Sequence, residues 1–175
     1  LSLIFTNPLP AHLTSALRDS VDPVLNTWIL AWDQHALLTQ PAHILDANIF
    51  FPYADALLYS ETLIVPSILL LPVALAGANP VAIHNLMVLL GFTLTGFTGY
   101  LLGKELLRNR AAGFAAGLVL AFNPYTLSVM PKAQLLQLYW LPLALVYVCK
   151  LLRRPRPIYG LAVAGYLAAQ FYTVI

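Results

Sequence analysis

The chain has 175 residues, of which 60% are hydrophobic and only 9% are charged. A water-soluble domain carries about 25% charged residues, so this composition excludes an ordinary soluble domain and favours a chain surrounded by lipid. The formal net charge of +2 arises from few charged residues and therefore says little about nucleic acid, and we expect no nucleic-acid partner. The single cysteine, Cys149, lies in an apolar run, which excludes an intrachain disulfide and a paired-cysteine metal site.

Both ends of the sequence fall in apolar runs. The chain begins with Leu1 rather than Met, its first five residues (LSLIF) are typical of the end of an apolar helix, and Ile175 lies in another apolar run. We therefore interpret residues 1–5 as the end of a first membrane span. We also expect the natural chain to continue at both ends.

Residues 6–79 form a long connection that is more polar than the rest of the chain and contains many aromatic residues. Asp22 precedes the segment PVLNTWILAWDQHALL, in which Pro23 suits the first turn of a helix. We predict a helix over about 23–38 with Asp22 as its N-cap. Because tryptophan and tyrosine rings favour the headgroup region of a bilayer, this helix is expected to lie on the membrane surface.

The helical spacing of this segment separates its side chains. Val24 and Trp28 share one face, with His35 one turn further on, whereas Asn26 and Asp33 point elsewhere. We interpret Asp33 and His35 as the wetted edge of the helix. A role in a functional site is the alternative for both.

The other acidic residues of the connection have different contexts. Asp46 and Asp55 lie in turn-like sequence (LDAN and YADA), where a side-chain bond to the backbone is the usual role. Glu61 lies where a proline-rich apolar segment begins, so it is either a helix cap or a carboxylate against the spans with a functional role. Asp22 is likewise either only a cap or also a carboxylate at the mouth of a cavity.

The segment 62–77 is apolar, but Pro66 and Pro72 interrupt it. A membrane span needs about 20 apolar residues for a hydrocarbon core of about 30 Å, whereas this segment would cover about 24 Å as a helix. It is either a short span or an interfacial helix. We prefer the interfacial helix, which makes 6–79 one external loop.

Four later segments are long and apolar enough to be membrane spans. They cover about 80–103, 111–130, 134–152 and 157–175. Pro124 and Pro142 are expected to kink their helices. Glycines in the first two of these spans, among them Gly113 and Gly117, predict close helix packing. The sequence therefore predicts an all-α, polytopic membrane protein.

The charged residues are divided along the chain. Seven of the nine basic residues lie in the connectors KELLRNR and KLLRRPRP, which the positive-inside rule assigns to the cytoplasm. With 62–77 at the interface, six of the seven acidic residues are then external. These are Asp19, Asp22, Asp33, Asp46, Asp55 and Glu61.

The sequence contains no Gly-rich phosphate loop, GxSxG elbow or HExxH motif. Its four histidines have no metal-binding spacing among themselves. The sequence therefore predicts no metal site. Asp22 and Glu61 are the residues that would hold a divalent cation as a cofactor, although no spacing specifies a ligand set.

The order of these features resembles a known class of enzymes. An apolar stub precedes RDSVDPVLNTWILAWDQHALL with its early Asp, then the string DANIFFPYADALLYSE, and later a span ending AFNPY before MPKAQLLQLYWLPL. This order resembles the GT-C class of membrane glycosyltransferases, and more narrowly the mannosyltransferase-type and RgtA/B/C/D-like proteins of bacteria. The resemblance covers nearly the whole chain. It implies the N-terminal part of a larger GT-C-like bundle with a large first external loop.

The resemblance also implies a function. Such an enzyme is integral to the bacterial inner (plasma) membrane and moves a sugar from a polyprenyl-phosphate donor to a glycan, lipid or protein acceptor on the external face. Its general base is an acidic residue of the first external loop. Asp22 matches that position best in this chain, and Asp33 is the fallback. Membrane lipid and the lipid-linked donor are the implied partners.

This chemistry needs a base near the acceptor hydroxyl and positive charge near the leaving phosphate. Asp22 is the candidate base, and the candidate substrate-binding residues are Arg18, His35, Glu61, Lys132 and Gln134. Sequences of the resembled class often have a His before the Gln of the segment that here reads PKAQLL. This chain instead has Lys132 and Ala133 before Gln134, so a role for a His at this position does not carry over. Alternatively, Arg18 only pairs with Asp22 on the surface, and Lys132 only extends its amine to the membrane interface.

A non-enzymatic membrane carrier, or an assembly subunit for lipid-linked glycans, is the alternative function. A carrier needs polar groups at the middle of the bilayer, whereas the enzyme needs an acidic side chain in an outward cavity. The predicted spans contain few polar residues other than Thr, Ser and Asn, which favours the enzyme.

Overall fold

The structure, a computed structural model, describes residues 1–174. The regular elements of this range are all helices, with no strand, so the predicted all-α class is confirmed. The α-helices are α1 (Ser2–Phe5), α2 (Asp22–Thr39), α3 (Ile64–Leu75), α4 (Pro80–Leu107), α5 (Arg110–Phe122), α6 (Pro124–Ser128), α7 (Trp140–Arg153) and α8 (Pro157–Val174). Short 3-10 helices are η1 (Leu9–His12), η2 (Pro41–His43), η3 (Ala56–Tyr59) and η4 (Ala133–Leu136).

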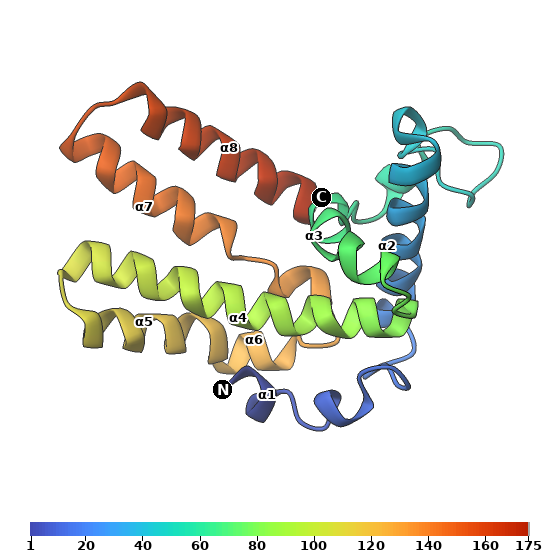
Figure 1. The fold of residues 1–175 in the computed structure, drawn as a ribbon, viewed down its shortest axis with the longest axis horizontal. Helices are drawn as coiled ribbons and strands as arrows, with labels where there is room; N and C mark the ends of the chain where they lie inside the picture. The colour runs from blue at the N-terminus through green and yellow to red at the C-terminus, as the bar shows by residue number, and fades with distance from the viewer. Residues whose placement is uncertain (175) are drawn as a thin grey trace.

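Two antiparallel helical hairpins extend along the molecule, and α2 crosses one end of them (Figure 1). The first hairpin is α4–α5 and the second is α7–α8, with α4 packed against α7 between them. α2 and α3 pack against each other and against α4. The molecule therefore has two unlike ends: the hairpin turns form one, and the long connection 6–79 contributes most of the other (Figure 1).

Glycines bring α4 and α5 into close contact. An added Cβ on Gly113 would lie 2.8 Å from the carbonyl oxygen of Tyr100, and one on Gly99 would lie 3.1 Å from the Cα of Gly117. Side chains larger than hydrogen would therefore separate the two helices. The close packing predicted from these glycines is confirmed.

α5 ends at Phe122, earlier than the predicted span 111–130. The Asn123 side chain accepts a hydrogen bond from the backbone N–H of Thr126 at 2.9 Å and donates to two carbonyls of the last turn of α5. Pro124 follows in the first turn of α6, where its missing N–H costs nothing. One residue thus ends one helix and begins the next, so the chain breaks here instead of kinking.

Pro142 also differs from its predicted effect. It lies in the first turn of α7, where the backbone N–H groups have no intrahelical partner, so no hydrogen bond is lost. Within the described chain, α4 and the segment 133–153 are the two helical segments long and apolar enough to cross a membrane. α8 follows the predicted span 157–175 as far as Val174, and Ile175 lies outside the described residues.

α3 confirms a helix within 62–77, although a shorter one. Its 12 residues extend about 18 Å, well short of a hydrocarbon core of about 30 Å. Pro66 lies in its first turn and Pro72 inside it. Its position at the membrane interface stays a prediction.

The apolar core lies at the α2 end of the molecule. It joins α2, α3, the first half of α4 and η4. Its fully or nearly fully buried members include Ile29, Leu30, Leu57, Leu63, Ile83, Met87, Phe92 and Leu136. The core thus fixes the connection 6–79 against the bundle, although this connection has little regular structure outside α2 and α3.

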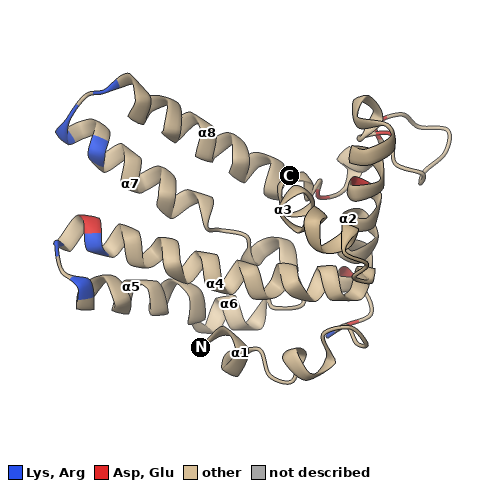
Figure 2. Ribbon diagram, viewed as in Figure 1, with Lys and Arg blue, Asp and Glu red and all other residues tan. Residues whose placement is uncertain are grey.

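Opposite charges gather at the two ends of the bundle (Figure 2). Seven of the nine basic residues lie at or near the α4–α5 and α7–α8 turns, and Arg18 and Lys132 do not. Among the described residues, Glu105 is the one acidic residue at this end. The other six acidic residues lie at or near the α2 end (Figure 2). In helical membrane proteins, the positive-inside rule associates such an excess of Lys and Arg with the cytoplasmic end.

Candidate functional site

An open pocket of 440 Å³ lies where the start of α2, the chain just before α3 and η4 meet. Asp22, Leu25, Asn26, Leu58, Tyr59, Ser60, Glu61, Gln134 and Val174 line it. Three predicted site residues, Asp22, Glu61 and Gln134, are therefore brought together from distant parts of the sequence.

Asp22 begins α2 but is not its N-cap. Val21 occupies the cap position, and no side chain caps this helix end. The carboxylate instead lies 3.9 Å from the Nζ of Lys132, with about a third of the side chain exposed (34%). Because a pair this exposed contributes little to stability, the carboxylate has no structural bond that would be lost if it contacted a substrate.

Gln134 joins Glu61 to α2 through hydrogen bonds. The Nε2 of Gln134 donates to the Oε1 of Glu61 at 3.1 Å, and the Nδ2 of Asn26 donates to the Oε1 of Gln134 at 2.6 Å. The hydroxyl of Ser60 donates to the other oxygen of Glu61 at 2.8 Å. Both oxygens of Glu61 therefore have protein donors, which fix its orientation at the pocket.

The backbone near Glu61 is held by the core. Leu63 adopts the left-handed conformation (φ +43°), which costs a non-glycine residue about 1–3 kcal/mol. Its side chain is fully buried in the apolar core, and this burial offsets the strain. Core packing two residues away thus determines where Glu61 enters the pocket.

Asn26 is a pocket residue that the sequence did not single out. It is fully buried, and its Oδ1 has no hydrogen-bond partner among the described residues. An unsatisfied buried oxygen costs about 1–3 kcal/mol, so a hydroxyl that donated to it would be favoured. Its spacing of four residues from Asp22, which puts both on one helical face, was the signal that could have identified it.

Asp33 is buried and does not lie at a wetted edge of α2, so that interpretation is wrong. It has no solvent exposure, the hydroxyl of Ser67 donates to its Oδ2 at 3.1 Å, and its Oδ1 has no partner among the described residues. Burial raises the pKa of Asp33 to about 8, against the opposing effect of the Ser67 hydrogen bond. The Asp33 side chain lies between α2 and α3 and does not line the pocket. Its burial depends on packing against α3, where Ser67 is its hydrogen-bond donor.

His35 and Arg18 also lie away from the pocket. His35 is exposed and lies 3.4 Å from the hydroxyl of Thr39. The guanidinium of Arg18 donates to the Sδ of Met130 at 2.9 Å, and within residues 1–174 it forms no ion pair with Asp22. The predicted surface pair between Arg18 and Asp22 is therefore wrong, because Lys132 is the cation beside Asp22.

Asp46 has the turn role that its sequence predicts. It accepts a hydrogen bond from the backbone N–H of Asp55 at 2.9 Å and pairs with His43 at 2.9 Å. These bonds lower the pKa of Asp46. They hold the connection between η2 and η3 and place Asp46 outside the pocket.

Comparisons of the chain with models of protein families, with curated proteins and with solved structures find no match. The pocket therefore has to be interpreted from its own chemistry. Asp22 can accept a proton from a hydroxyl, Asn26 and Gln134 can bond to hydroxyl groups, and Lys132 can contact an anionic oxygen.

The described residues include no group of three or more His, Cys, Asp and Glu side chains arranged for a metal ion. Asp22 and Glu61 would supply two oxygen ligands to a divalent cation, and the remaining ligands would have to be amide oxygens, substrate or water. The pocket is thus better suited to a polar organic ligand with hydroxyl groups than to a tightly held structural metal.

Proposed function

We propose that this protein is an integral membrane glycosyltransferase of GT-C type, which moves a sugar from a polyprenyl-phosphate donor to an acceptor on the external face. One observation carries the proposal: Asp22 and Glu61 line a single open pocket at the end of the bundle opposite the basic turns. Such a transferase needs an acidic side chain in an outward cavity at the membrane surface.

The outer surfaces of the helices support a membrane location. Large apolar side chains are exposed on α4, α5, α7 and α8, where water would be an unfavourable neighbour. They include Phe97, Phe114, Val119, Leu145, Leu161 and Phe171. With the basic turns in the cytoplasm, the pocket opens on the external side of a bacterial inner membrane.

In the proposed reaction, the hydroxyl oxygen of the acceptor attacks the anomeric carbon of the sugar. Asp22 accepts the proton of that hydroxyl at the same time. The bond between that carbon and the phosphate oxygen breaks, and polyprenyl phosphate leaves with the electron pair. Lys132 stabilises the negative charge of the leaving phosphate. Glu61, held by Ser60 and Gln134, orients the hydroxyl groups of the bound sugar.

The alternative, a membrane carrier or assembly subunit for lipid-linked glycans, would need available polar groups within the spans. Thr95 and Thr98 are the buried hydroxyls along the middle of α4. The Thr95 hydroxyl donates to the carbonyl of Leu136 at 3.2 Å, and that of Thr98 donates to the carbonyl of Thr95 at 3.2 Å. Both are thus engaged within the protein. The buried polar atoms without a partner on the described parts of α4 and α8, Nε2 of His84 and Oε1 of Gln170, lie near the helix ends at the α2 side and not at mid-span, which favours the enzyme.

The test measures transfer from a panel of radiolabelled polyprenyl-phosphate sugars in membranes that contain the protein. We expect Asp22→Asn to reduce transfer by about a hundredfold or more, because loss of a general base typically has this effect. Asp19→Asn removes an exposed carboxylate three residues away that lies outside the pocket, and is expected to transfer at the wild-type rate. Wild-type protein that transfers no sugar from the panel would favour the carrier, and an active Asp22→Asn variant would exclude Asp22 as the base.

A further inference from the structure

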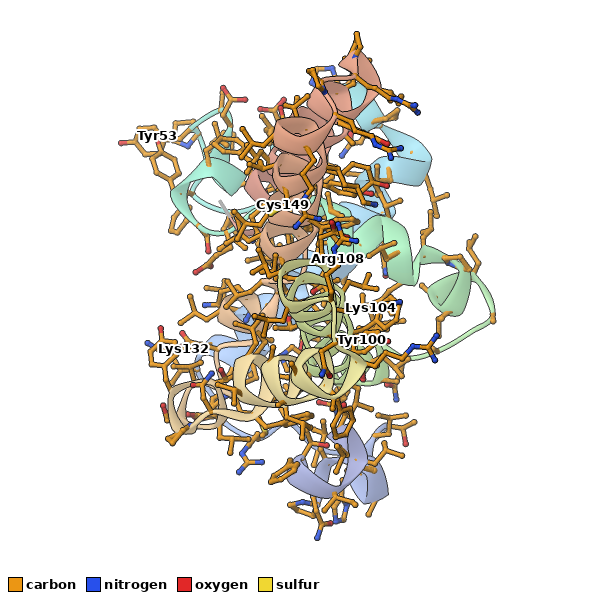
Figure 3. All side chains as sticks on the ribbon, turned by 90° about the vertical axis from the view of Figure 1, so that its left-hand side faces the viewer. Tyr53, Tyr100, Lys104, Arg108, Lys132 and Cys149 are labelled. Atoms are coloured by element: carbon orange, nitrogen blue, oxygen red, sulfur yellow. The ribbon has the colours of Figure 1, made fainter. Side chains whose placement is uncertain are left out.

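A second pocket, of 570 Å³, lies at the opposite end of the bundle, between the two hairpins. It is lined by Leu101, Lys104, Glu105, Arg108, Arg110, Leu143, Val146, Tyr147, Lys150 and Tyr166. These residues come from α4, the α4–α5 turn, the start of α5, α7 and α8. Figure 3 views the molecule from this end, with Lys104 and Arg108 near the centre.

The pocket has an excess of positive charge. Lys104, Arg108, Arg110 and Lys150 line it, and no ion pair with any of these four is found within residues 1–174. The one carboxylate in the lining, Glu105, is already engaged by the guanidinium of Arg153. The uncompensated charge therefore favours an anionic ligand.

The rest of the pocket is apolar and aromatic. Leu101, Leu143 and Val146 form part of its wall. The ammonium of Lys150 lies 4.5 Å from the ring centre of Tyr147, which holds one cation at the edge of this apolar surface. The ligand that fits is therefore amphipathic, with an anionic head at the basic residues and an apolar part between the hairpins.

Arg108 is held in the pocket lining at a conformational cost. It follows the last residue of α4 in the left-handed conformation (φ +53°), a position where glycine is the usual residue. An arginine there is strained by its Cβ, and no hydrogen bond or ion pair of its side chain compensates within the described structure. Backbone strain that no contact within the protein compensates is often found at ligand-binding residues.

The positive-inside rule accounts for basic residues at this end but not for their place around a pocket. Arg154 and Arg156 lie at the same end of the bundle, in the α7–α8 turn, yet they do not line the pocket. We propose that this pocket binds the phosphate headgroup of an anionic phospholipid at Lys104, Arg108 and Lys150, with an acyl chain against the apolar wall. The inference shares with the proposed function only the membrane location, and it needs no sugar transfer.

The test measures lipid retention by the purified full-length protein in detergent, by native mass spectrometry with phosphatidylglycerol or phosphatidylcholine. We expect phosphatidylglycerol to bind more tightly to wild-type protein. The double variant Lys104→Gln, Lys150→Gln should weaken that binding by about twenty-five-fold, since each basic residue near an anionic headgroup contributes about fivefold. The matched variant Arg154→Gln, Arg156→Gln removes the same charge from the same end and should retain the lipid.

Three results would overturn the inference. Equal loss in the two double variants would mean general electrostatic attraction without a site. Equal retention of phosphatidylcholine would exclude the anionic headgroup, and displacement by millimolar inorganic phosphate would identify a free-phosphate site. The assay contains no sugar donor, so an inactive transferase leaves its outcome unaffected.

A second variant separates binding from folding. Arg108→Gly removes a cation but relieves the left-handed strain, so thermal stability in detergent should not fall. Binding of phosphatidylglycerol should fall by about fivefold. A stable variant with unchanged lipid binding would remove Arg108 from the site.

Discussion

The Asp33 carboxyl is buried between α2 and α3 with one hydrogen-bond donor, the Ser67 hydroxyl. In the unfolded chain it ionises near pH 3.8, whereas the folded chain keeps the proton until about pH 8. Between these values the folded state binds more protons than the unfolded state. The free energy of unfolding therefore falls as pH rises, by about 1.4 kcal/mol per unit, and levels off above about pH 8.

We predict that Asp33→Asn removes this dependence. Asparagine has nearly the shape of the protonated acid, can accept the same Ser67 hydrogen bond and stays neutral at every pH. Chemical denaturation of the two proteins across this pH range measures the effect. The variant should be more stable than wild type above pH 8, and an unchanged pH slope in the variant would show that another group causes it.

Single residues also mark where the sequence was insufficient. Glu61 could be selected because a carboxylate beside an apolar segment is rare, and Asp22 because it matches the acidic residue that the resemblance implies. Asp33 and Asn26 were assigned to the outside of α2 because polar side chains ordinarily face water. Asp33 is instead buried against Ser67, and Asn26 against Gln134. Both partners are distant in sequence, so helical spacing within 22–39 does not reveal these contacts.

At the scale of elements, the apolar runs and prolines predicted the positions of α2, α3, α4 and α8 closely. The predicted span 134–152 is divided, because η4 covers its start and α7 begins only at Trp140. The end of α5 at Phe122 was missed, because Pro124 was interpreted as a kink. The outcome was decided by Asn123, whose side chain can cap two helices at once. Capping of this kind depends on local rotamers, which hydropathy does not contain.

The α4–α5 contact gives a prediction at this scale. A Cβ at Gly117 would overlap the carbonyl oxygen of Gly96, whereas one at Gly165 in α8 would meet no atom within 4 Å. Gly117→Ala should therefore lower the melting temperature, at a cost of about 1–3 kcal/mol. Gly165→Ala should leave it unchanged or raise it, because alanine is the better helix former. Equal melting temperatures for the two variants would contradict the close packing.

At the scale of the whole molecule, charge separates along the bundle and α2 crosses its acidic end (Figure 2). The sequence indicated this separation, since seven of the nine basic residues lie in two connectors that the positive-inside rule assigns to one side of a membrane. It could not predict which polar residues meet at the acidic end. That pocket forms only when the chain around 58–61, α2 and η4 pack together.

The proposed orientation predicts which end an impermeant reagent reaches. Phe51, in the 6–79 connection, is almost fully exposed (96%). In a Cys149→Ala background, Phe51→Cys therefore puts the one thiol of the chain at an exposed position. A membrane-impermeant maleimide should label it in intact cells. Arg156→Cys, at the basic end, should be labelled only after permeabilisation, and the reverse pattern would invert the orientation.

The most direct test of the central claim compares sugar transfer by Asp22→Asn and Asp33→Asn in the same membranes. Asp22 lines the pocket and has only an exposed partner, whereas Asp33 is buried outside it. We predict that Asp22→Asn loses transfer from the polyprenyl-phosphate donor, while Asp33→Asn, at equal abundance, keeps it. Transfer that survives in Asp22→Asn and is lost in Asp33→Asn would contradict the assignment of the pocket as the site of the reaction.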